Sequence, residues 1–424
     1  MFMEFKDAIN EVKKSKNIFI MSHYDCDGLC SAKILSETLK RERKEINIKI
    51  VNELGNSAIK EIDKAKEDLV ILSDLGSGYL SKLPDRKIII LDHHIPENVN
   101  RKNIIHINPV LDNKELCGAG VCYLFSETLN KNNLDLIDFA VVGAIGDNQI
   151  ETGENKKIKK KAIESGRLKI EKGLNIFGHI NRELHLSLKY ADFFPLNQES
   201  EIIEFLTELE IPLNNNGKIK SYCDLSKKEK EKLILEIIKE RIRNNIENPE
   251  DIFSDIYILT QQPRKLSDAL EYSTILNAFG RLEKCTEALE LMDKKTEKLY
   301  ETMREYKQKI ASYLEWVNKN IKNFIEVDNE LLIIDSGKNI HENMIGTITS
   351  IMINNTNKNI IIGLAEGEEY IKISARSKTT PVDVIVKDIC QKCGGYGGGH
   401  KKAAGGKIDK NKKNEFIDKI LEVF

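Results

Sequence analysis

The sequence has no apolar run as long as the roughly 18 residues that a membrane-spanning helix needs. Its first residues, Met1 to Lys6, also lack the apolar core of a secretory signal peptide. These absences exclude both kinds of membrane segment, so we expect a cytoplasmic protein with no membrane partner. A hydrophobic content of 41% is nonetheless enough for sizeable cores, and 424 residues allow more than one domain.

Cysteine is present but is not arranged as a disulfide framework. The eight cysteines are scattered along the chain, which predicts reduced thiols in a cytosolic protein. Cys390 and Cys393 form a lone Cys-x-x-Cys pair, without a second pair at zinc-finger spacing. Zinc binding or redox chemistry at this pair therefore stays open as an alternative.

The chain also lacks the excess of positive charge that is typical of nucleic-acid-binding proteins, because its net charge is −2. The charge is unevenly distributed, however. Residues 372–413 contain 11 Lys and Arg against 3 Asp. Local charge decides phosphate binding, so this segment is a candidate contact for a nucleic-acid backbone. A solvated basic surface is the alternative.

What the sequence does contain is four short clusters of acidic and histidine residues within its first 150 positions. Each cluster follows an apolar run. A single Asp after such a run is usually a helix cap or a turn former, but four clusters in succession indicate one site built from distant parts of the chain. The clusters are His23-Tyr24-Asp25-Cys26-Asp27-Gly28, Ser73-Asp74, Asp92-His93-His94 and Gly146-Asp147-Asn148.

The apolar runs at residues 17–21, 69–72 and 88–91 are predicted strands, since unbroken apolar runs suit strands that are buried on both faces. The intervening residues 29–43 and 57–66 are predicted helices. Strand–helix alternation predicts an α/β fold with a doubly wound, mostly parallel sheet. Ligands of such sheets bind outside the carboxyl ends of the strands. We expect the clusters to converge there, the fourth one from the end of an apolar helix.

Carboxylates gathered in one place repel each other unless cations compensate their charge. The clusters combine carboxylate oxygens with imidazole nitrogens and include no obligatory thiolate, which favours Mn²⁺ or Mg²⁺ over a structural zinc. They also hold more ligands than one tetrahedral site needs. We therefore predict two divalent metal ions, about 3.5–4 Å apart with a bridging carboxylate, of the kind that promotes phosphoryl chemistry.

The order and spacing of the clusters resemble the DHH phosphoesterase superfamily. The His-x-Asp-x-Asp-Gly form that starts at His23 resembles the RecJ branch rather than the family II pyrophosphatases. None of the motif positions departs from the family pattern, so the resemblance implies an active metal-dependent phosphoesterase.

The resemblance also implies a role for each cluster residue. Asp92 would be a metal ligand or would orient the histidines, and His94 would face the scissile phosphate as a donor, which makes these two the expected catalytic residues. The expected metal ligands besides Asp92 are His23 and Asp25 for a first ion, Asp27, His93 and Asp147 for a second, and Asp74 as the bridge.

A second informative segment covers residues 393–406, which read Cys-Gly-Gly-Tyr-Gly-Gly-Gly-His-Lys-Lys-Ala-Ala-Gly-Gly. A glycine-rich loop leaves backbone N–H groups open to anions, although a flexible linker has a similar composition. Together with residues 371–377, the segment resembles the DHH-associated domain. The resemblance implies a clamp for nucleotide phosphates made of Arg376, Ser377, Gly398, Gly399 and His400, with Lys401 and Lys402 beside it.

We expect a catalytic core at residues 1–150, a mainly helical extension at 151–286, a connector helix at 287–326 and a smaller substrate-binding α/β domain at 327–424. The prediction of a connector helix rests on an amphipathic pattern over residues 287–324. Just before it, Leu276-Asn277-Ala278-Phe279-Gly280-Arg281 resembles a segment of RecJ-like proteins. Arg281 either reaches the substrate or packs within a helix, and both interpretations stay open.

These features predict a Mn²⁺- or Mg²⁺-dependent exonuclease that releases mononucleotides from single-stranded DNA or RNA. The resemblance to archaeal RecJ-like proteins favours a role in DNA replication or repair, with replication proteins of the GINS type as further partners. One alternative is a phosphodiesterase for short oligoribonucleotides or cyclic dinucleotides. Another is a replisome scaffold in which catalysis is incidental.

Overall fold

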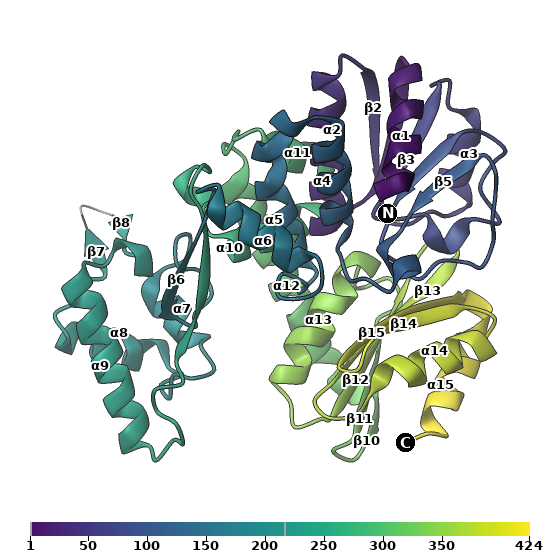
Figure 1. Ribbon diagram of the computed structural model, residues 1–424. Coiled ribbons are helices and arrows are strands. Elements are labelled where there is room, and N and C mark those ends of the chain that lie inside the picture. The colour runs from purple at the N-terminus through teal and green to yellow at the C-terminus, as the bar shows by residue number, and fades with distance from the viewer. Residues whose placement is uncertain (1, 216–217) are drawn as a thin grey trace. The chain divides into compact units, whose positions relative to one another are not determined.

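The computed structural model describes residues 2–215 and 218–424 (Figure 1). The chain divides into two units, with Lys298 as the last residue of the first and Leu299 as the first residue of the second. Each unit has its own sheet and its own hydrophobic core. In the described part of the chain, no helix is both long enough and apolar enough to span a bilayer.

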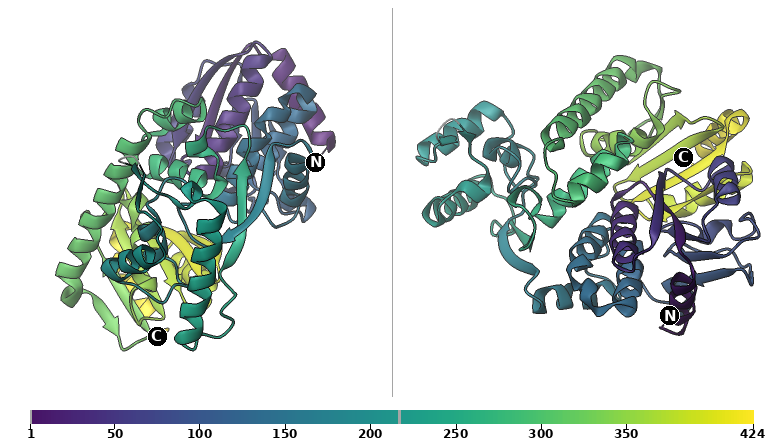
Figure 2. Two further views of the ribbon diagram at one scale, coloured as in Figure 1. Left: turned by 90° about the vertical axis from the view of Figure 1, so that its left-hand side faces the viewer. Right: turned by 90° about the horizontal axis from the view of Figure 1, so that it is seen from above.

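The first unit is built around a parallel sheet that is covered by helices on both faces. Its strands are β1 (Asn17–His23), β2 (Glu45–Val51), β3 (Leu69–Ser73), β4 (Ile88–Leu91) and β5 (Ile104–Ile107), and its first helices are α1 (Phe2–Lys14), α2 (Cys26–Arg41), α3 (Asn56–Lys64), α4 (Gly118–Leu129) and α5 (Ile137–Gly146). The strand order is β2-β1-β3-β4-β5. Helices α1, α2 and α4 pack on one face and α3 packs on the other (Figure 2).

This architecture confirms the predicted α/β class and its parallel sheet. Strands β3 and β4 are buried along their whole length, as their unbroken apolar runs predict. The edge strands β2 and β5 were not predicted. In β2, exposed and half-buried positions alternate because the strand lies at the edge of the sheet, so its sequence has no continuous apolar run.

A lobe of the first unit follows α6 (Asn155–Glu164) and is held by an antiparallel ribbon of β6 (Leu168–Leu174) and β9 (Phe253–Leu259). Between these strands the chain forms α7 (Leu184–Lys189), α8 (Glu199–Glu208), a short hairpin of β7 (Asn214–Asn215) and β8 (Lys218–Ile219), and α9 (Lys227–Arg243). Leu188, Ile202 and Leu233 belong to a separate buried core in this lobe. Helix α10 (Ala269–Arg281) then returns the chain to α2 and α5.

The single long helix expected over residues 287–324 is instead two helices, α11 (Cys285–Met292) and α12 (Leu299–Asn320). Lys294, between them, has a φ of 67°, a left-handed conformation that a right-handed helix does not contain. The carboxylate of the neighbouring Asp293 forms an ion pair with Lys33 of α2. The apolar stripes of two consecutive helices therefore resembled one continuous stripe.

The second unit begins with α12 and contains a six-stranded sheet of order β10-β11-β12-β13-β15-β14. Its further elements are β10 (Ile325–Val327), β11 (Leu331–Asp335), α13 (Glu342–Asn354), β12 (Ile360–Glu366), β13 (Tyr370–Ser377), α14 (Val382–Lys392), β14 (Tyr396–His400), β15 (Ala403–Asp409) and α15 (Lys413–Leu421). Ile362, Ile373, Val386 and Phe416 are part of one buried core that joins the sheet to α14 and α15.

Most of the glycine-rich segment forms the hairpin β14–β15, so the alternative of a flexible linker is wrong. A Cβ atom at Gly406 would lie 2.5 Å from Sγ of Cys390, so glycine at this position lets α14 pack directly on the hairpin. Cys390 and Cys393 are both buried here, and burial raises the pKa of both thiols, that of Cys390 to about 12. Thiolate chemistry is therefore disfavoured at this pair.

Candidate metal centre

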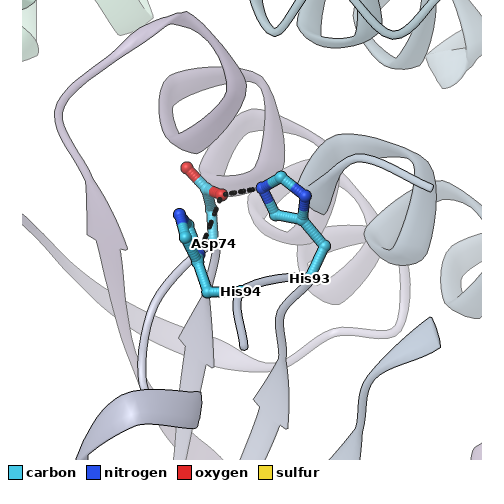
Figure 3. A group of neighbouring side chains, drawn as sticks. All are labelled: Asp74, His93 and His94. Carbon is cyan, nitrogen blue, oxygen red and sulfur yellow. Dashed lines mark ion pairs between the residues drawn. The ribbon is translucent and has the colours of Figure 1, made fainter. Parts of the chain in front are cut away.

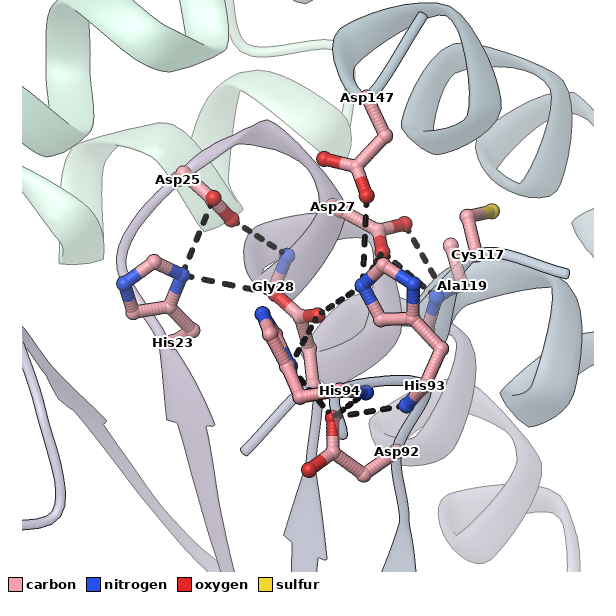
Figure 4. Close-up of polar contacts among 12 residues, drawn as sticks. His23, Asp25, Asp27, Gly28, Asp92, His93, His94, Cys117, Ala119 and Asp147 are labelled. Atoms are coloured by element: carbon pink, nitrogen blue, oxygen red, sulfur yellow. Dashed lines mark hydrogen bonds and ion pairs between the residues drawn. The ribbon is translucent and has the colours of Figure 1, made fainter. Parts of the chain in front are cut away.

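The predicted metal ligands gather at the carboxyl edge of the parallel sheet (Figure 4). Parallel strands all end at the same edge, which is why residues far apart in the sequence meet there. Three strands carry ligands at this edge: β1 ends at His23, β3 is followed by Asp74, and β4 is followed by Asp92, His93 and His94. Two helices supply the others: α2 has Asp25 and Asp27 at its start, and α5 has Asp147 as the cap of its end.

Asp74 is held in an unusual conformation at this edge. Its φ is 56°, in the left-handed region that residues other than Gly, Asn and Asp rarely adopt. Its side chain is 2% exposed. Gly118 at the start of α4 makes room for it, because a Cβ atom there would lie 2.9 Å from Oδ1 of Asp74. Strained backbone of this kind is concentrated at functional sites.

One group of ligand atoms comes from His23, Asp25 and Asp74. Nδ1 of His23 lies 3.0 Å from Oδ2 of Asp25 and 3.5 Å from Oδ2 of Asp74. The other oxygen of Asp25 accepts a hydrogen bond of 3.0 Å from the backbone N–H of Gly28, which holds this carboxylate in place. The ligand atoms of the three residues lie within 4.8 Å of one another, close enough for one cation to contact all of them.

A second group comes from Asp27, His93 and Asp147. Nε2 of His93 lies 3.3 Å from Oδ2 of Asp147 and 3.7 Å from Oδ2 of Asp27. The same nitrogen lies 3.2 Å from Oδ1 of Asp74 (Figure 3). Asp74 therefore directs one oxygen toward each group, which is the arrangement of a bridging carboxylate.

In the metal-free protein, the histidines compensate part of the negative charge. Burial alone would lower the pKa of His23, but the nearby carboxylates of Asp25 and Asp74 raise it well above its usual value. Burial would likewise lower the pKa of His93, and the carboxylates around it, that of Asp74 above all, raise it well above its usual value. The surrounding carboxylates therefore favour the protonated form of both rings, and a bound cation would compete with these protons.

The carboxyl groups of the site respond to the same crowding. Burial, together with the negative charges of Asp25 and Asp74, raises the pKa of Asp147 to about 7. Burial and the charge of Asp74 raise the pKa of Asp27 well above its usual value. Protons and cations therefore compete for this cluster of carboxylates.

The donor atoms fit hard divalent cations. They are carboxylate oxygens and imidazole nitrogens, which suit Mn²⁺ and Mg²⁺. Two of them, Nδ1 of His23 and Oδ2 of Asp74, are buried and have no hydrogen-bond partner among the residues that the structure describes. The 3.0 Å contact from His23 to Asp25 is an ion pair that lacks hydrogen-bond geometry. Buried polar atoms are rarely left unsatisfied, and a shared cation would satisfy both.

Asp92 lies behind the two groups, and its carboxylate is occupied by protein donors. Oδ2 accepts a hydrogen bond of 2.9 Å from the backbone N–H of Ser77, and Oδ1 lies 2.7 Å from Nδ1 of His94. Among the described residues, the groups that could hold a metal do not include Asp92. These contacts orient His94, whose backbone oxygen also accepts a hydrogen bond of 2.8 Å from Asn108.

His94 differs from the other two histidines because its side chain is 55% exposed. Partial burial would lower its pKa, but the adjacent Asp92 carboxylate raises the pKa above the usual value. A protonated, exposed ring is suited to contact a phosphate oxygen. His94 also forms a third potential ligand group with Asp74 and His93, since its Nδ1 lies 4.0 Å from Oδ1 of Asp74.

Two sets of contacts in the site were not predicted from the sequence. The backbone N–H groups of Gly118 and Ala119 donate to the two oxygens of Asp27 at 2.6 and 2.9 Å. Asn277 of α10 accepts a hydrogen bond of 3.0 Å from the backbone N–H of Cys26, which fixes the turn that carries Asp25. The small residues Gly118, Ala119 and Gly120, with which the apolar helix α4 begins, were a signal for the first contact.

The second contact belongs to the segment at residues 276–281, in which Arg281 was a candidate contact for the substrate. Arg281 is the partly buried last residue of α10. The residues of this segment that approach the metal centre are Asn277 and Gly280, since a Cβ atom at Gly280 would lie 2.0 Å from the backbone oxygen of Tyr24. Close packing of α10 against the ligand-bearing turn therefore explains why this segment contains Asn277 and Gly280.

Three protein-family models match the chain. The N-terminal domain of the DHH family matches residues 17–145, which contain every ligand described above except Asp147. The DHH-CID domain matches residues 176–252, and the DHHA1 domain matches residues 328–424. The chain belongs to the DHH superfamily. It is a RecJ-like DHH phosphoesterase with a C-terminal DHHA1 domain.

Two relatives illustrate the range of similarity. The DHH chain is 29% identical over 436 residues to an uncharacterized protein of Methanocaldococcus jannaschii, a match that covers 96% of this chain and 93% of that protein. It is 26% identical over 180 residues to the single-stranded-DNA-specific exonuclease RecJ of Bacillus subtilis. That second match covers 38% of this chain and 23% of the exonuclease, so it supports common ancestry over one part of each protein.

Solved structures share the fold at low sequence identity. RecJ of Thermus thermophilus in complex with Mn²⁺ has a TM-score of 0.61 and 17% identity, covering 98% of this chain and 54% of that one. The DHH chain thus spans about half the length of this RecJ. CDC45 of Entamoeba histolytica also has a TM-score of 0.61, at 14% identity, over 99% of this chain and 98% of that one. RecJ of Thermus thermophilus has been solved in complex with Mn²⁺ and with Mg²⁺. In the DHH chain, the groups of acidic and histidine residues described above could hold metal ions.

The predicted phosphate clamp lies in the DHHA1 domain. Nε of Arg376 donates to Oγ of Ser350 at 2.8 Å, which holds the guanidinium group against α13. The backbone N–H of Ser377 donates to the backbone oxygen of Lys402 at 3.0 Å, so the end of β13 lies beside the turn of the hairpin. The structure therefore brings the clamp residues to one region of this domain. Gly398, Gly399 and His400 lie in β14, and the exposed Lys401 and Lys402 form the turn between β14 and β15.

Proposed function

We propose that this DHH protein is a phosphodiesterase that uses two divalent cations, preferably Mn²⁺ or else Mg²⁺, and removes mononucleotides from single-stranded nucleic acid. The observation that carries the proposal is the position of Asp74 between two groups of ligand atoms, with one of its oxygens facing each group. A pair of cations held in this way would activate a water molecule and would stabilise the entering and leaving oxygens of phosphoryl transfer.

The side chains of the protein have distinct roles in this proposal. His94 donates a hydrogen bond to an oxygen of the scissile phosphate and compensates charge there. Asp92 keeps the ring of His94 oriented through the 2.7 Å contact with Nδ1 and supports its protonated form. His23 and Asp25 would hold one cation, Asp27, His93 and Asp147 would hold the other, and Asp74 would contribute one oxygen to each.

Single-stranded nucleic acid is proposed as the substrate class on two grounds. The sequence match to the single-stranded-DNA-specific exonuclease of B. subtilis supports a related substrate. The positive charge at residues 372–413, with Arg376, His400 and Lys401 in it, is suited to hold phosphates. In this proposal, residues 1–150 with the extension at 151–286 form the catalytic part, and residues 327–424 bind the substrate.

A cytoplasmic role in DNA replication or repair, with replication proteins as partners, belongs to the same proposal. A scaffold without catalysis is disfavoured, since a scaffold has no use for ligand atoms from six residues of distant segments. A hydrolase for short oligonucleotides or cyclic dinucleotides would use the same metal centre and would differ from our proposal in how its activity depends on substrate length.

Digestion of end-labelled DNA and RNA, resolved by fragment length, tests the proposal. We expect mononucleotides from single strands in Mn²⁺, slower release in Mg²⁺, little release from blunt duplexes, and none after chelation. Asp63→Ala, which replaces an exposed carboxylate on α3, is the control for loss of charge elsewhere in the chain. Hydrolysis of dinucleotides alone would favour the short-oligonucleotide hydrolase. The absence of hydrolysis of any strand would refute the proposal that the protein is a nuclease.

A further inference from the structure

An exposed group of aromatic and basic side chains lies in the lobe between β6 and β9, outside the metal centre. The guanidinium carbon of Arg182 lies 5.7 Å from the ring centre of Phe177 and 4.8 Å from that of Tyr190. Phe177 is 38% exposed and Tyr190 is 63% exposed. We name Phe177, Arg182 and Tyr190 the aromatic–arginine cluster.

The side-chain N–H groups of Arg182 donate to no acceptor among the described residues of the chain, although the negative charge of Glu271 acts on the guanidinium group. Its neighbours in the cluster are aromatic rings, which offer cation–π contacts and no hydrogen-bond acceptor of the carbonyl or carboxylate kind. Arg241 in the same lobe, by contrast, donates to the backbone oxygens of Phe193 and Asn248. The free donors of a guanidinium group are suited to the oxygens of a phosphate or a nucleobase.

The local fold holds Arg182 in this position. Gly178 has a φ of 94°, and a Cβ atom on it would lie 2.3 Å from Cβ of Arg182, so the tight approach requires glycine. The intervening residues are tied to the start of α10. The backbone N–H groups of Ile180 and Asn181 donate to the carboxylate of Glu271 at 2.7 and 3.1 Å.

Helix α10 connects the aromatic–arginine cluster to the metal centre within the first unit. Glu271 near its start holds the loop that carries Arg182, and Asn277 near its end binds the turn that carries Asp25. Glu271 and Asn277 are six positions apart on α10, which is about 9 Å along the helix axis. At the stacked rise of about 3.4 Å per nucleotide, about three nucleotides cover that length, and fewer suffice when the strand is stretched.

From these observations we propose that the aromatic–arginine cluster binds single-stranded nucleic acid a few nucleotides away from the end that is cleaved. In this inference, which rests on the proposed function for the identity of the strand, a base stacks on Tyr190 and Arg182 donates to phosphate or base oxygens. Lys189 contributes less charge, because it forms an ion pair of 3.2 Å with Glu199. The cluster thereby selects substrates by length.

Binding is measured directly, by fluorescence anisotropy of a labelled thymidine dodecamer and of a labelled thymidine dinucleotide, with Ca²⁺ in place of Mn²⁺ to suppress cleavage. Loss of one stacked base weakens binding by about 5- to 150-fold. For Arg182→Ala and for Tyr190→Ala we expect at least about a fivefold higher Kd for the dodecamer and less than about a twofold change for the dinucleotide. Tyr190→Phe keeps the ring and should keep the parent affinity.

The matched control is Arg243→Ala, which removes an exposed arginine from α9 of the same lobe. It should leave the Kd of both ligands unchanged. If Arg182→Ala does not fold, Tyr190→Ala decides the test, because its ring is the most exposed part of the cluster.

An unchanged dodecamer Kd in Tyr190→Ala, or equal losses for both lengths, would overturn the inference and leave the proposed function standing. An unchanged dodecamer Kd is also the result expected if the cluster contacts another protein and not nucleic acid. A parent protein that binds the dodecamer through the cluster but cleaves no strand in Mn²⁺ would instead overturn the proposed function and support this binding site.

Discussion

Oδ1 of Asp74 lies 3.2 Å from Nε2 of His93. The two residues follow the neighbouring strands β3 and β4, so the contact depends on the parallel register of the sheet. The other oxygen of Asp74 faces His23 at 3.5 Å. A single buried carboxylate thus joins the two groups of ligand atoms, and the account of two cations depends on it.

Asp74→Ala should reduce the number of bound Mn²⁺ ions from the expected pair and should weaken the binding of any ion that remains. The reason is that the substitution removes one ligand atom from each group. Isothermal titration with Mn²⁺ measures both effects, and far-UV circular dichroism checks the fold. The control Asp63→Ala should bind like the parent. An unchanged stoichiometry in Asp74→Ala would contradict the bridging role.

His94→Ala should lower kcat by about 10²- to 10⁴-fold while changing Mn²⁺ affinity little, since the ring is proposed to contact the phosphate. Steady-state kinetics on a short single strand and Mn²⁺ titration of the same variant give the two quantities. Asp92→Asn should lower kcat in the same direction, because it weakens the group that orients His94. Loss of Mn²⁺ binding in His94→Ala would show that His94 is a metal ligand together with Asp74 and His93.

The metal-free protein should become less stable as the pH rises from 5 to 8. Burial and nearby carboxylates raise the pKa of Asp147 to about 7, so the folded protein holds a proton that the unfolded chain releases near pH 4. The pKa of His23 and that of His93 are also raised, despite burial, by neighbouring carboxylates, so their contribution to stability begins to fall above about pH 6.5 and continues to fall toward the raised pKa values of the folded protein.

Thermal unfolding in chelator at several pH values measures this trend, and Asp147→Asn should make it shallower. Saturating Mn²⁺ should reverse the trend, because deprotonated ligands bind the cation. A melting temperature that stays level or rises between pH 5 and 8 in chelator would show that the carboxylates do not share protons as described.

Lys401→Ala with Lys402→Ala should weaken the binding of a long single strand more than that of a dinucleotide. Both lysines are exposed at the turn of the β14–β15 hairpin, where they can contact successive phosphates. Each lost contact should lower the slope of log Kd against log salt by about 0.7. The comparison is a salt titration in Ca²⁺, with Lys227→Ala and Lys228→Ala on α9 as the control pair. An unchanged slope would exclude contacts between these lysines and phosphates.

The ligands of the candidate site were predictable because each follows an apolar run. The buried strands β3 and β4 have an unmistakable sequence pattern, and topology alone brings the residues after them to one edge. The contacts that hold the ligands were not predictable in this way. Asn277 meets Cys26 across 251 positions of the chain, and Gly118 contributes through its backbone N–H group, so neither leaves a local pattern.

Differences in the fold have similarly physical causes. The break between α11 and α12 depends on the left-handed conformation of Lys294 and the ion pair of Asp293 with Lys33, and the amphipathic stripe continues across it. The glycines near residue 400 resemble a flexible loop by composition, but Gly406 is needed where α14 packs on a hairpin. The aromatic surroundings of Arg182 depend on the fold of the lobe, so the sequence does not show that its N–H groups lack an acceptor.

The most direct test of the central claim is hydrolysis of one end-labelled single strand in Mn²⁺ by the parent protein and by Asp74→Ala, side by side. The account predicts mononucleotides from the parent, none after chelation, and a loss of at least about 10³-fold in rate for the variant, since neither cation keeps its shared ligand. An Asp74→Ala rate within about tenfold of the parent in saturating Mn²⁺ would contradict the two-cation mechanism.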